Sequence, residues 1–214
     1  MSETKPKKIV FVCTGNTCRS PMAEYLFKHI LKKEKLRGFK ICSAGLEAAK
    51  GGLMNSYTAQ VLAEHKVTVG KFTSTLVNEK LLKEAFAVIC MTEDQADRLM
   101  DWRWNILHRA GEQEIENTVY AFQQFTGYAV PDPYGREIDA YRYVYGLLEG
   151  GMYEIIEKLG LKQYALPTPV KTTGTGKRGR PKKVETGEPK APTPPKKRGR
   201  PKKETPTEQL KMDI

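Results

Sequence analysis

Short apolar runs alternate with helical patterns through residues 8–161 of this 214-residue chain. Runs such as 8–13 (KIVFVC) and 85–91 (AFAVICM) are continuous and β-branched, which is typical of strands buried on both faces of a parallel sheet. The pattern predicts strands at 8–13, 39–45, 85–91 and 117–122, and helices at 20–31, 55–66, 93–100 and 138–161. We therefore predict an α/β fold of three layers, in which a four-stranded parallel sheet has helices on both faces.

The composition changes after residue 163. Residues 164–214 hold 14 Lys and Arg against 5 Asp and Glu, whereas residues 1–163 hold 22 against 20. The later segment is rich in Pro, Thr, Lys and Gly, and it has too few large apolar residues to offset the entropy lost on ordering. We therefore divide the chain into a folded domain at 1–163 and a disordered basic tail at 164–214. A basic tail indicates an anionic partner, most simply nucleic acid.

Other bulk features exclude several classes of protein. The four cysteines form no CxxC pair and the three histidines are scattered, so we expect no metal site and no cofactor. The polar start lacks the apolar core of a signal peptide, and the apolar runs are far shorter than the roughly 18 residues that a membrane span needs. These features favour a protein of a reducing compartment, namely the cytoplasm, with nucleoid association if the source is bacterial. We expect the protein to be a monomer.

The segment VCTGNTCRSP (12–21) lies where such a fold would place a ligand, because ligands bind beyond the carboxyl ends of parallel strands. A loop between a strand and a helix can turn its backbone N–H groups towards one centre, beside the positive end of the helix dipole. Gly15 permits a tight turn, and Thr14 and Asn16 can bond the loop to itself. Arg19 can grip two oxygens of a tetrahedral oxyanion.

Such an anion cradle would also activate Cys13. An electropositive loop favours a thiolate over a thiol, and a thiolate beneath a bound phosphate is placed for in-line attack on phosphorus. Ser20 can donate to the sulfur, and it can also cap the following helix, with Pro21 at the first helical position. Taken alone, the Cys-x5-Arg spacing also fits an ordinary turn with a buried cysteine and a surface arginine.

A phosphatase needs a proton donor for the leaving group. In VPDPYG (130–135), prolines on both sides stiffen Asp132, and the segment follows the fourth predicted strand by a loop. Asp132 is therefore a candidate general acid, although a Pro-Asp-Pro sequence on its own is also a common turn.

The strings FVCTGNTCRSPMAE, SAG and DPYG together resemble the low-molecular-weight protein-tyrosine phosphatase family, in order, from residue 8 to about 160. The resemblance implies that Cys13 is the nucleophile of a phosphocysteine route, that Arg19 clamps the phosphate, and that Asp132 is general acid and then base. It implies that Asn16, Ser20 and Ser43 hold the loop, and that Cys18 is the second cysteine, which in relatives can form a protective disulfide with the nucleophile. The phosphate loop it implies consists of Thr14, Gly15, Asn16, Thr17, Cys18 and Arg19.

The resemblance leaves two substrates open. Tyrosine phosphatases of the family usually carry Ile at the position of Thr17, whereas the protein-arginine phosphatases carry Thr, whose hydroxyl can bond a phosphoguanidinium or its attacking water. The arginine enzymes also place an aromatic where this chain has Glu47, which can pair with a guanidinium or remain a solvated charge. Tyr134 fits a wall beside phosphotyrosine. The sequence leans towards phosphoarginine; the DPYG acid makes arsenate reduction, on the same fold, a poor match.

The tail contains the heptapeptide KRGRPKK twice, at 177–183 and 197–203. Its Gly-Arg-Pro centre resembles the AT-hook of high-mobility-group A proteins, which implies binding in the narrow, negative minor groove of A·T-rich double-stranded DNA. One copy would also fit a solubilising patch, but two copies favour hooks. The 13 residues between them reach about 45 Å when extended, more than one turn of DNA. The predicted DNA-binding residues are Arg178, Gly179, Arg180, Pro181, Arg198, Gly199, Arg200 and Pro201.

The sequence thus predicts a metal-independent phosphatase that acts on a phosphorylated protein and is tethered to DNA. The alternative is a DNA-binding protein whose phosphatase-like domain is a silent phosphate sensor. The intact set of Cys13, Arg19 and Asp132 argues against that alternative.

Overall fold

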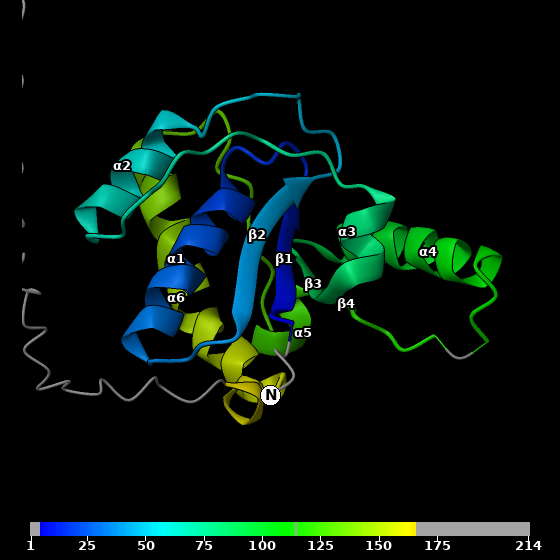
Figure 1. Cartoon of the computed structure of the whole chain (residues 1–214). Coiled ribbons are helices and arrows are strands. Elements are labelled where there is room, and N and C mark those ends of the chain that lie inside the picture. The colour runs from blue at the N-terminus through cyan, green and yellow to red at the C-terminus, as the bar shows by residue number, and fades with distance from the viewer. Residues whose placement is uncertain (1–4, 114, 166–214) are drawn as a thin grey trace, which may run out of the picture. The chain divides into compact units, whose positions relative to one another are not determined.

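The computed structural model describes residues 5–113 and 115–165 (Figure 1). The tail from residue 166 onward, with both predicted hooks, lies outside the described residues. The described part contains one sheet of parallel strands in the order β2-β1-β3-β4. The strands are β1 (Lys7–Cys13), β2 (Phe39–Gly45), β3 (Ala85–Cys90) and β4 (Val119–Ala121). The predicted four-stranded parallel sheet is confirmed.

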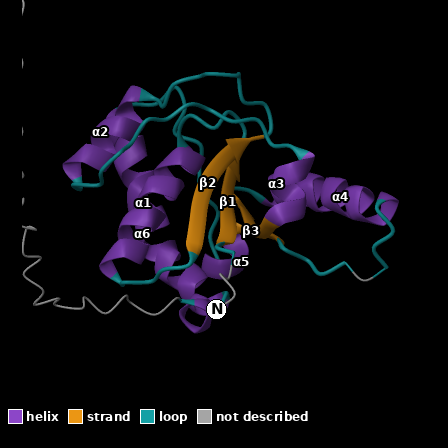
Figure 2. Cartoon of the chain, viewed as in Figure 1, coloured by secondary structure: helices purple, strands orange, loops and turns teal. Residues whose placement is uncertain are grey.

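Helices cover both faces of this sheet (Figure 2). They are α1 (Arg19–Lys33), α2 (Ser56–Glu64), α3 (Glu79–Glu84), α4 (Glu93–Arg109), α5 (Phe122–Thr126) and α6 (Ile138–Lys158), followed by the 3-10 helix η1 (Leu161–Tyr164). The sequence did not predict the short helices α3 and α5. It ended α4 nine residues too early, at 100, and made β4 longer than the three residues observed.

The alternation of side chains along β1 explains how one strand packs against helices on both faces of the sheet. Ile9 and Phe11 pack among α1, α2, α5 and α6, whereas Val10 and Val12 pack on the opposite face among α3 and α4. Each of these side chains is almost completely buried. This burial on both faces is why the strand is apolar at consecutive positions.

The start of α1 differs from the expectation. Cys18 is the N-cap residue, its side chain makes no capping bond, and the helix begins at Arg19. The prediction that Ser20 caps the helix is therefore wrong. Because the helix starts one residue before Ser20, this hydroxyl turns inward and bonds the loop that precedes the helix.

The strand order places a crevice at the carboxyl end of β1. Its neighbours are β2 on one side and β3 on the other, so the chain leaves β1 and β3 in opposite directions across the sheet. Crevices at such points are where open α/β sheets bind ligands. None of the helices in residues 5–113 and 115–165 is both long and apolar enough to cross a bilayer.

Candidate active site

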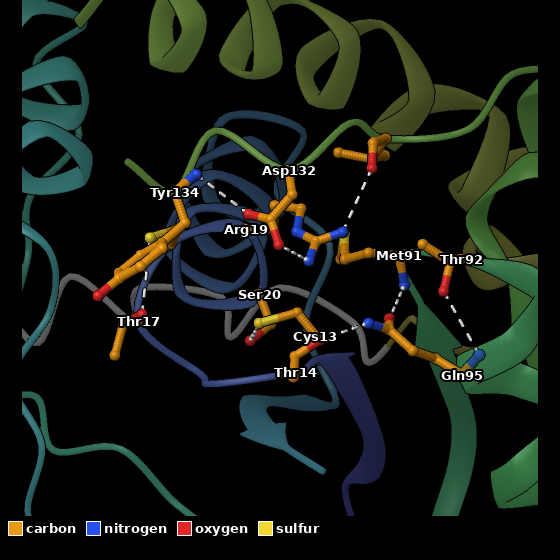
Figure 3. A network of polar contacts seen from close by, with 12 residues as sticks. Cys13, Thr14, Thr17, Arg19, Ser20, Met91, Thr92, Gln95, Asp132 and Tyr134 are labelled. Carbon is orange, nitrogen blue, oxygen red and sulfur yellow. Dashed lines mark hydrogen bonds and ion pairs between the residues drawn. The ribbon is translucent and has the colours of Figure 1, made fainter. Parts of the chain in front are cut away.

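A cavity of about 350 Å³ opens at the carboxyl end of β1. The loop that joins β1 to α1 forms its floor through Cys13, Thr14, Gly15, Thr17 and Cys18. Arg19 and Asp132 line it as well, so the structure brings the three predicted catalytic residues to one place (Figure 3). Its remaining lining comprises Glu47, Ala49, Gly52, Ser74 and Tyr134.

The backbone of this loop is free to bind an anion. Among the described residues, no backbone N–H from Thr14 to Cys18 has a hydrogen-bond partner. These donors precede α1, whose N-terminal end carries a partial positive charge. A tetrahedral oxyanion supplies the acceptors that such a loop needs.

Asn16 fixes the shape of the loop. It is fully buried and has a φ of 53°, in the left-handed region that asparagine adopts more readily than most residues. Its Nδ2 donates to Ser20 Oγ and to Ser43 Oγ, each at 2.9 Å, and its Oδ1 accepts from the Thr75 backbone N–H at 2.8 Å. The amide thus joins the loop to α1, to β2 and to the segment after α2.

Ser20 also lies beside the predicted nucleophile. Its Oγ is 3.0 Å from Cys13 Sγ and 3.2 Å from the carbonyl oxygen of Ala44. A hydroxyl has one hydrogen to donate, so it serves one of these acceptors at a time. When Cys13 is a thiolate, donation to the charged sulfur is the stronger choice.

Arg19 reaches across the cavity to the Asp132 loop. Its guanidinium is buried, with a side-chain exposure of 5%, whereas that of Asp132 is 50%. Nη2 donates to Asp132 Oδ2, and Nη1 donates to the carbonyl oxygen of Val130 at 3.4 Å. The other carboxylate oxygen, Oδ1, accepts from the backbone N–H of Tyr134 at 3.1 Å. The backbone of the turn that contains Asp132 therefore helps to orient the Asp132 carboxylate.

Cys18 occupies a different environment from that of a nucleophile. Its Sγ lies 3.7 Å from Tyr141 Oη and 3.6 Å from Thr17 Oγ1. Burial raises the pKa of the Cys18 thiol, and burial also raises the pKa of Tyr141. Both groups stay protonated at neutral pH. Cys18 is a free thiol in the structure, as is Cys13.

The three residues that could determine the choice of substrate, Thr17, Glu47 and Tyr134, line this cavity. Thr17 is half-buried, while Tyr134 is 72% exposed. Glu47 is exposed and, among the described residues, forms an ion pair with Arg98 at 3.8 Å. A carboxylate, a hydroxyl and a phenol ring, each from a different loop, therefore line the same cavity.

A scan against protein-family models matches residues 8–165 to low molecular weight phosphotyrosine protein phosphatase. The chain belongs to this phosphatase family. It is a hydrolase, and the family predicted from the sequence is confirmed.

Known phosphatases of two kinds are similar to the chain. A protein-arginine-phosphatase of Geobacillus stearothermophilus is 33% identical over 161 residues, which cover 74% of this chain and 99% of that protein. The low molecular weight protein-tyrosine-phosphatase Etp of Escherichia coli (strain K12) is 27% identical over 160 residues, with shares of 74% and 99%. A crystal structure of a YwlE mutant from Bacillus subtilis superposes with a TM-score of 0.62 at 30% identity, and it covers 72% of this chain and 99% of that one.

The tail matches a second family model. The AT hook motif matches at 175–187 and 195–207, around both copies of the heptapeptide. The motif predicted from the sequence is therefore present twice.

Two residues of this phosphatase site were missed by the sequence reasoning. Gln95 of α4 donates from Nε2 to Thr14 Oγ1 at 3.1 Å and accepts at Oε1 from the Met91 backbone N–H at 3.2 Å (Figure 3). Glu24 of α1 accepts a 2.6 Å hydrogen bond from Ser43 and forms an ion pair with Lys28. Both are buried polar side chains. The sequence signal of each is a polar residue on the inner side of a helix, and Glu24 is also the last residue of the string FVCTGNTCRSPMAE.

Gly45 ends β2 directly against the phosphate loop. A Cβ at this position would lie 2.5 Å from the Thr14 carbonyl oxygen and 2.8 Å from the Asn16 backbone nitrogen. These are backbone atoms and cannot move aside cheaply. The glycine of the SAG string therefore lets the loop pack beside the strand.

Proposed function

We propose that this protein removes phosphate from phosphorylated protein side chains through a phosphocysteine intermediate. Cys13 is the nucleophile, Arg19 is the phosphate clamp and Asp132 is the proton donor. The observation that carries the proposal is the placement around one cavity of a buried thiol, a guanidinium and a loop with five backbone N–H groups that have no partner among the described residues.

In the first step the phosphate lies in the loop, and its oxygens accept from the backbone N–H groups and from Arg19. The Arg19 guanidinium then exchanges Asp132 for the phosphate, which frees the carboxyl group to hold a proton near the leaving atom. The Cys13 thiolate forms a bond to phosphorus, the bond to the leaving nitrogen or oxygen breaks, and Asp132 gives its proton to that atom.

In the second step water replaces the leaving group. Asp132, now a carboxylate, takes a proton from this water as its oxygen bonds to phosphorus and the bond to sulfur breaks. Inorganic phosphate and the Cys13 thiolate result. Ser20 donates to the sulfur in both steps and lowers the energy of the departing thiolate.

The proposed substrate is phosphoarginine in a protein. Thr17 supplies a hydroxyl where the tyrosine enzymes of the family usually have Ile. Glu47 supplies a carboxylate that lines the same cavity, and its one ion pair within the described residues is long, at 3.8 Å to Arg98, so it is available to a substrate guanidinium. The 33% identity with a protein-arginine-phosphatase points the same way. The exposed ring of Tyr134 favours phosphotyrosine as the second candidate.

Parallel turnover measurements test this proposal. Peptides that carry phosphoarginine or phosphotyrosine in the same flanking sequence are assayed with the full chain and with Cys13→Ser. We expect a larger kcat/KM for phosphoarginine, and no turnover of either peptide by Cys13→Ser. A larger kcat/KM for phosphotyrosine would overturn the substrate assignment, and an active Cys13→Ser would overturn the mechanism.

We also propose that the tail binds A·T-rich double-stranded DNA through the minor groove. The two matches to the AT hook motif support this, together with the excess of 14 Lys and Arg over 5 Asp and Glu in residues 164–214. In each copy the arginines would lie along the groove floor while the lysines meet phosphates.

A further inference from the structure

The catalytic domain has a basic surface at the end opposite its active site. We define the basic edge as Lys5, Lys7, Lys8, Lys32, Lys35, Arg37 and Lys40. These residues lie at the starts of β1 and β2, at the end of α1 and in the loop between α1 and β2. In Figure 1 the starts of β1 and β2 lie together, at the opposite end of the sheet from the end of β1, which leads into the phosphate loop.

Two hollows make up this surface. One has a volume of about 470 Å³; Lys32, Lys35, Arg37 and Lys40 line it together with apolar side chains such as Phe39. The other, of about 420 Å³, is lined by Lys5, Lys7, Lys8 and Lys40. Because Lys40 lines both, the hollows adjoin and their cations form one continuous surface.

Few acidic groups neutralise these cations. Residues 28–40 contain six Lys or Arg and one acidic residue, Glu34. Within the part of the chain that the structure describes, Lys8 is the basic-edge residue that forms an ion pair, with Glu84 at 2.5 Å. Lys32, Lys35, Arg37 and Lys40 are exposed, and none has an acidic partner within 4.0 Å there. Residues 1–163 have nearly balanced charge, so the excess is local.

The described chain ends beside this surface. Lys7 Nζ lies 4.4 Å from the ring centre of Phe86 and 4.1 Å from that of Tyr164. These contacts hold η1, the last described helix, against the start of β1, and the next residue, Ala165, is the last one described. The described chain therefore ends at the basic edge, ten residues before the first match to the AT hook motif.

We infer that the basic edge binds the phosphate backbone of the DNA duplex that the hooks engage. The inference rests on the proposed DNA binding by the tail. Lysines spread over adjoining hollows suit an extended polyanion, and they give affinity without reading bases. β1 has seven residues, so at about 3.3 Å per residue the edge lies about 20 Å from Cys13. The active site stays open to a protein substrate while the opposite end rests on DNA.

A matched pair of triple variants of the full chain tests the inference. The test variant carries Lys32→Gln, Lys35→Gln and Lys40→Gln. The control carries Arg109→Gln, Lys66→Gln and Lys71→Gln, which removes the same charge elsewhere. The pairs are alike: Lys32 and Arg109 lie in the last turns of α1 and α4, and Lys35 and Lys66 both have a φ of 58°. Affinity for A·T-rich and G·C-rich duplexes is measured from 50 to 200 mM salt.

We expect the test variant to bind A·T-rich duplex with a slope of log K against log salt that is shallower by about 2–3 than that of wild type, at about 0.9 for each DNA phosphate that the variant no longer neutralises. The preference for A·T over G·C and the turnover of an aryl phosphate should not change, and the control should keep the wild-type slope. Equal slopes for the two variants would overturn the inference while leaving the hooks intact. Failure of the wild-type chain to bind any duplex would overturn both proposals. Unchanged DNA binding with weaker binding to phosphatidylserine vesicles would make this surface a membrane contact and overturn the inference.

Discussion

The guanidinium of Arg19 and the carboxylate of Asp132 form an ion pair within the cavity that both line, although they are 113 residues apart in the chain. Each therefore holds the other near the thiol of Cys13 before a substrate arrives. In the proposed mechanism the pair also couples phosphate binding to acid catalysis, because a phosphate that binds Arg19 releases Asp132.

Asp132→Asn should slow turnover of substrates whose leaving group needs a proton by about 10²–10⁴-fold. Activated aryl esters, whose leaving groups are stable as anions, should lose much less. Steady-state kcat on a series of leaving groups measures this. An equal loss on all of them would mean that Asp132 only supports the loop around Arg19.

Thr17→Ile should shift the ratio of kcat/KM for phosphotyrosine and phosphoarginine peptides towards phosphotyrosine. The substitution removes a hydroxyl from the cavity floor and adds apolar surface. Glu47→Gln provides a second probe, since it should weaken phosphoarginine turnover alone. A ratio that neither substitution moves would argue against the arginine assignment.

Two glycines of α6 should respond to alanine in opposite directions. A Cβ on Gly151 would lie 2.2 Å from Phe122 Cζ and 2.7 Å from Thr126 Cγ2, so Gly151→Ala should destabilise the fold by about 1–3 kcal/mol. Gly146 has no atom within 4 Å of such a Cβ, so Gly146→Ala should stabilise it by about 0.5–1 kcal/mol. Urea unfolding of both variants checks this, and the same sign for both would contradict it.

The ion pair between α2 and α6 should make the free energy of unfolding depend on pH in the acidic range. Arg142 donates to both carboxylate oxygens of Glu64, at 3.0 and 2.8 Å, and this holds the pKa of the Glu64 carboxyl below its usual range. The stabilisation is complete above the pKa of an unfolded glutamate, about 4.3, and is lost as pH falls through the lowered pKa.

Arg142→Ala should therefore lower the urea midpoint at pH 7, and the gap to wild type should be smaller at pH 3. Arg142→Lys keeps the charge but not the paired geometry, so its urea midpoint should lie between those of wild type and Arg142→Ala. A gap of the same size at both pH values would show that this carboxylate contributes nothing.

Truncation after Ala165 should leave kcat on an aryl phosphate unchanged, because the cut keeps η1 and the buried Leu161. It should remove the preference for A·T-rich duplex. In the full chain, alanine at Arg180 and Arg200 should remove that preference too, while salt-sensitive binding by the lysines persists. Gel-shift titrations on A·T and G·C duplexes measure both effects. A full chain that binds the two duplexes equally would contradict the assignment of hooks.

The central parts of this fold were predictable because their signals are local. β1 is a continuous apolar run, and the loop that follows it carries a long and specific string. The helix α3 has only six residues, too few for a periodic pattern to stand out, and α5 has five. In the second half of α4 the apolar spacing is interrupted by Arg103 and Asn105, which is why its end was placed too early.

The residues of the site that have a local sequence signal were also predictable. Cys13, Asn16 and Arg19 lie within one short segment, and Asp132 stands out between two prolines. Gln95 touches the site because α4, from a distant part of the chain, packs against the loop. Glu24 follows the loop in α1, but it reaches the loop only through Ser43 of β2. The sequence around each is ordinary for a helix. The inward turn of Ser20 depends on the first helical residue, and a shift of one position changes which way a side chain points.

The three hydrogen bonds of the Asn16 side chain carry a thermodynamic consequence. They form within the protein, so the entropy of ordering the phosphate loop is lost when the chain folds and not when a ligand binds. An oxyanion should then contribute nearly all of its interaction energy as affinity, and the loop should hold the same shape in the free and bound protein. Because only the folded state binds phosphate or vanadate, the melting temperature of the protein should rise with the concentration of either anion.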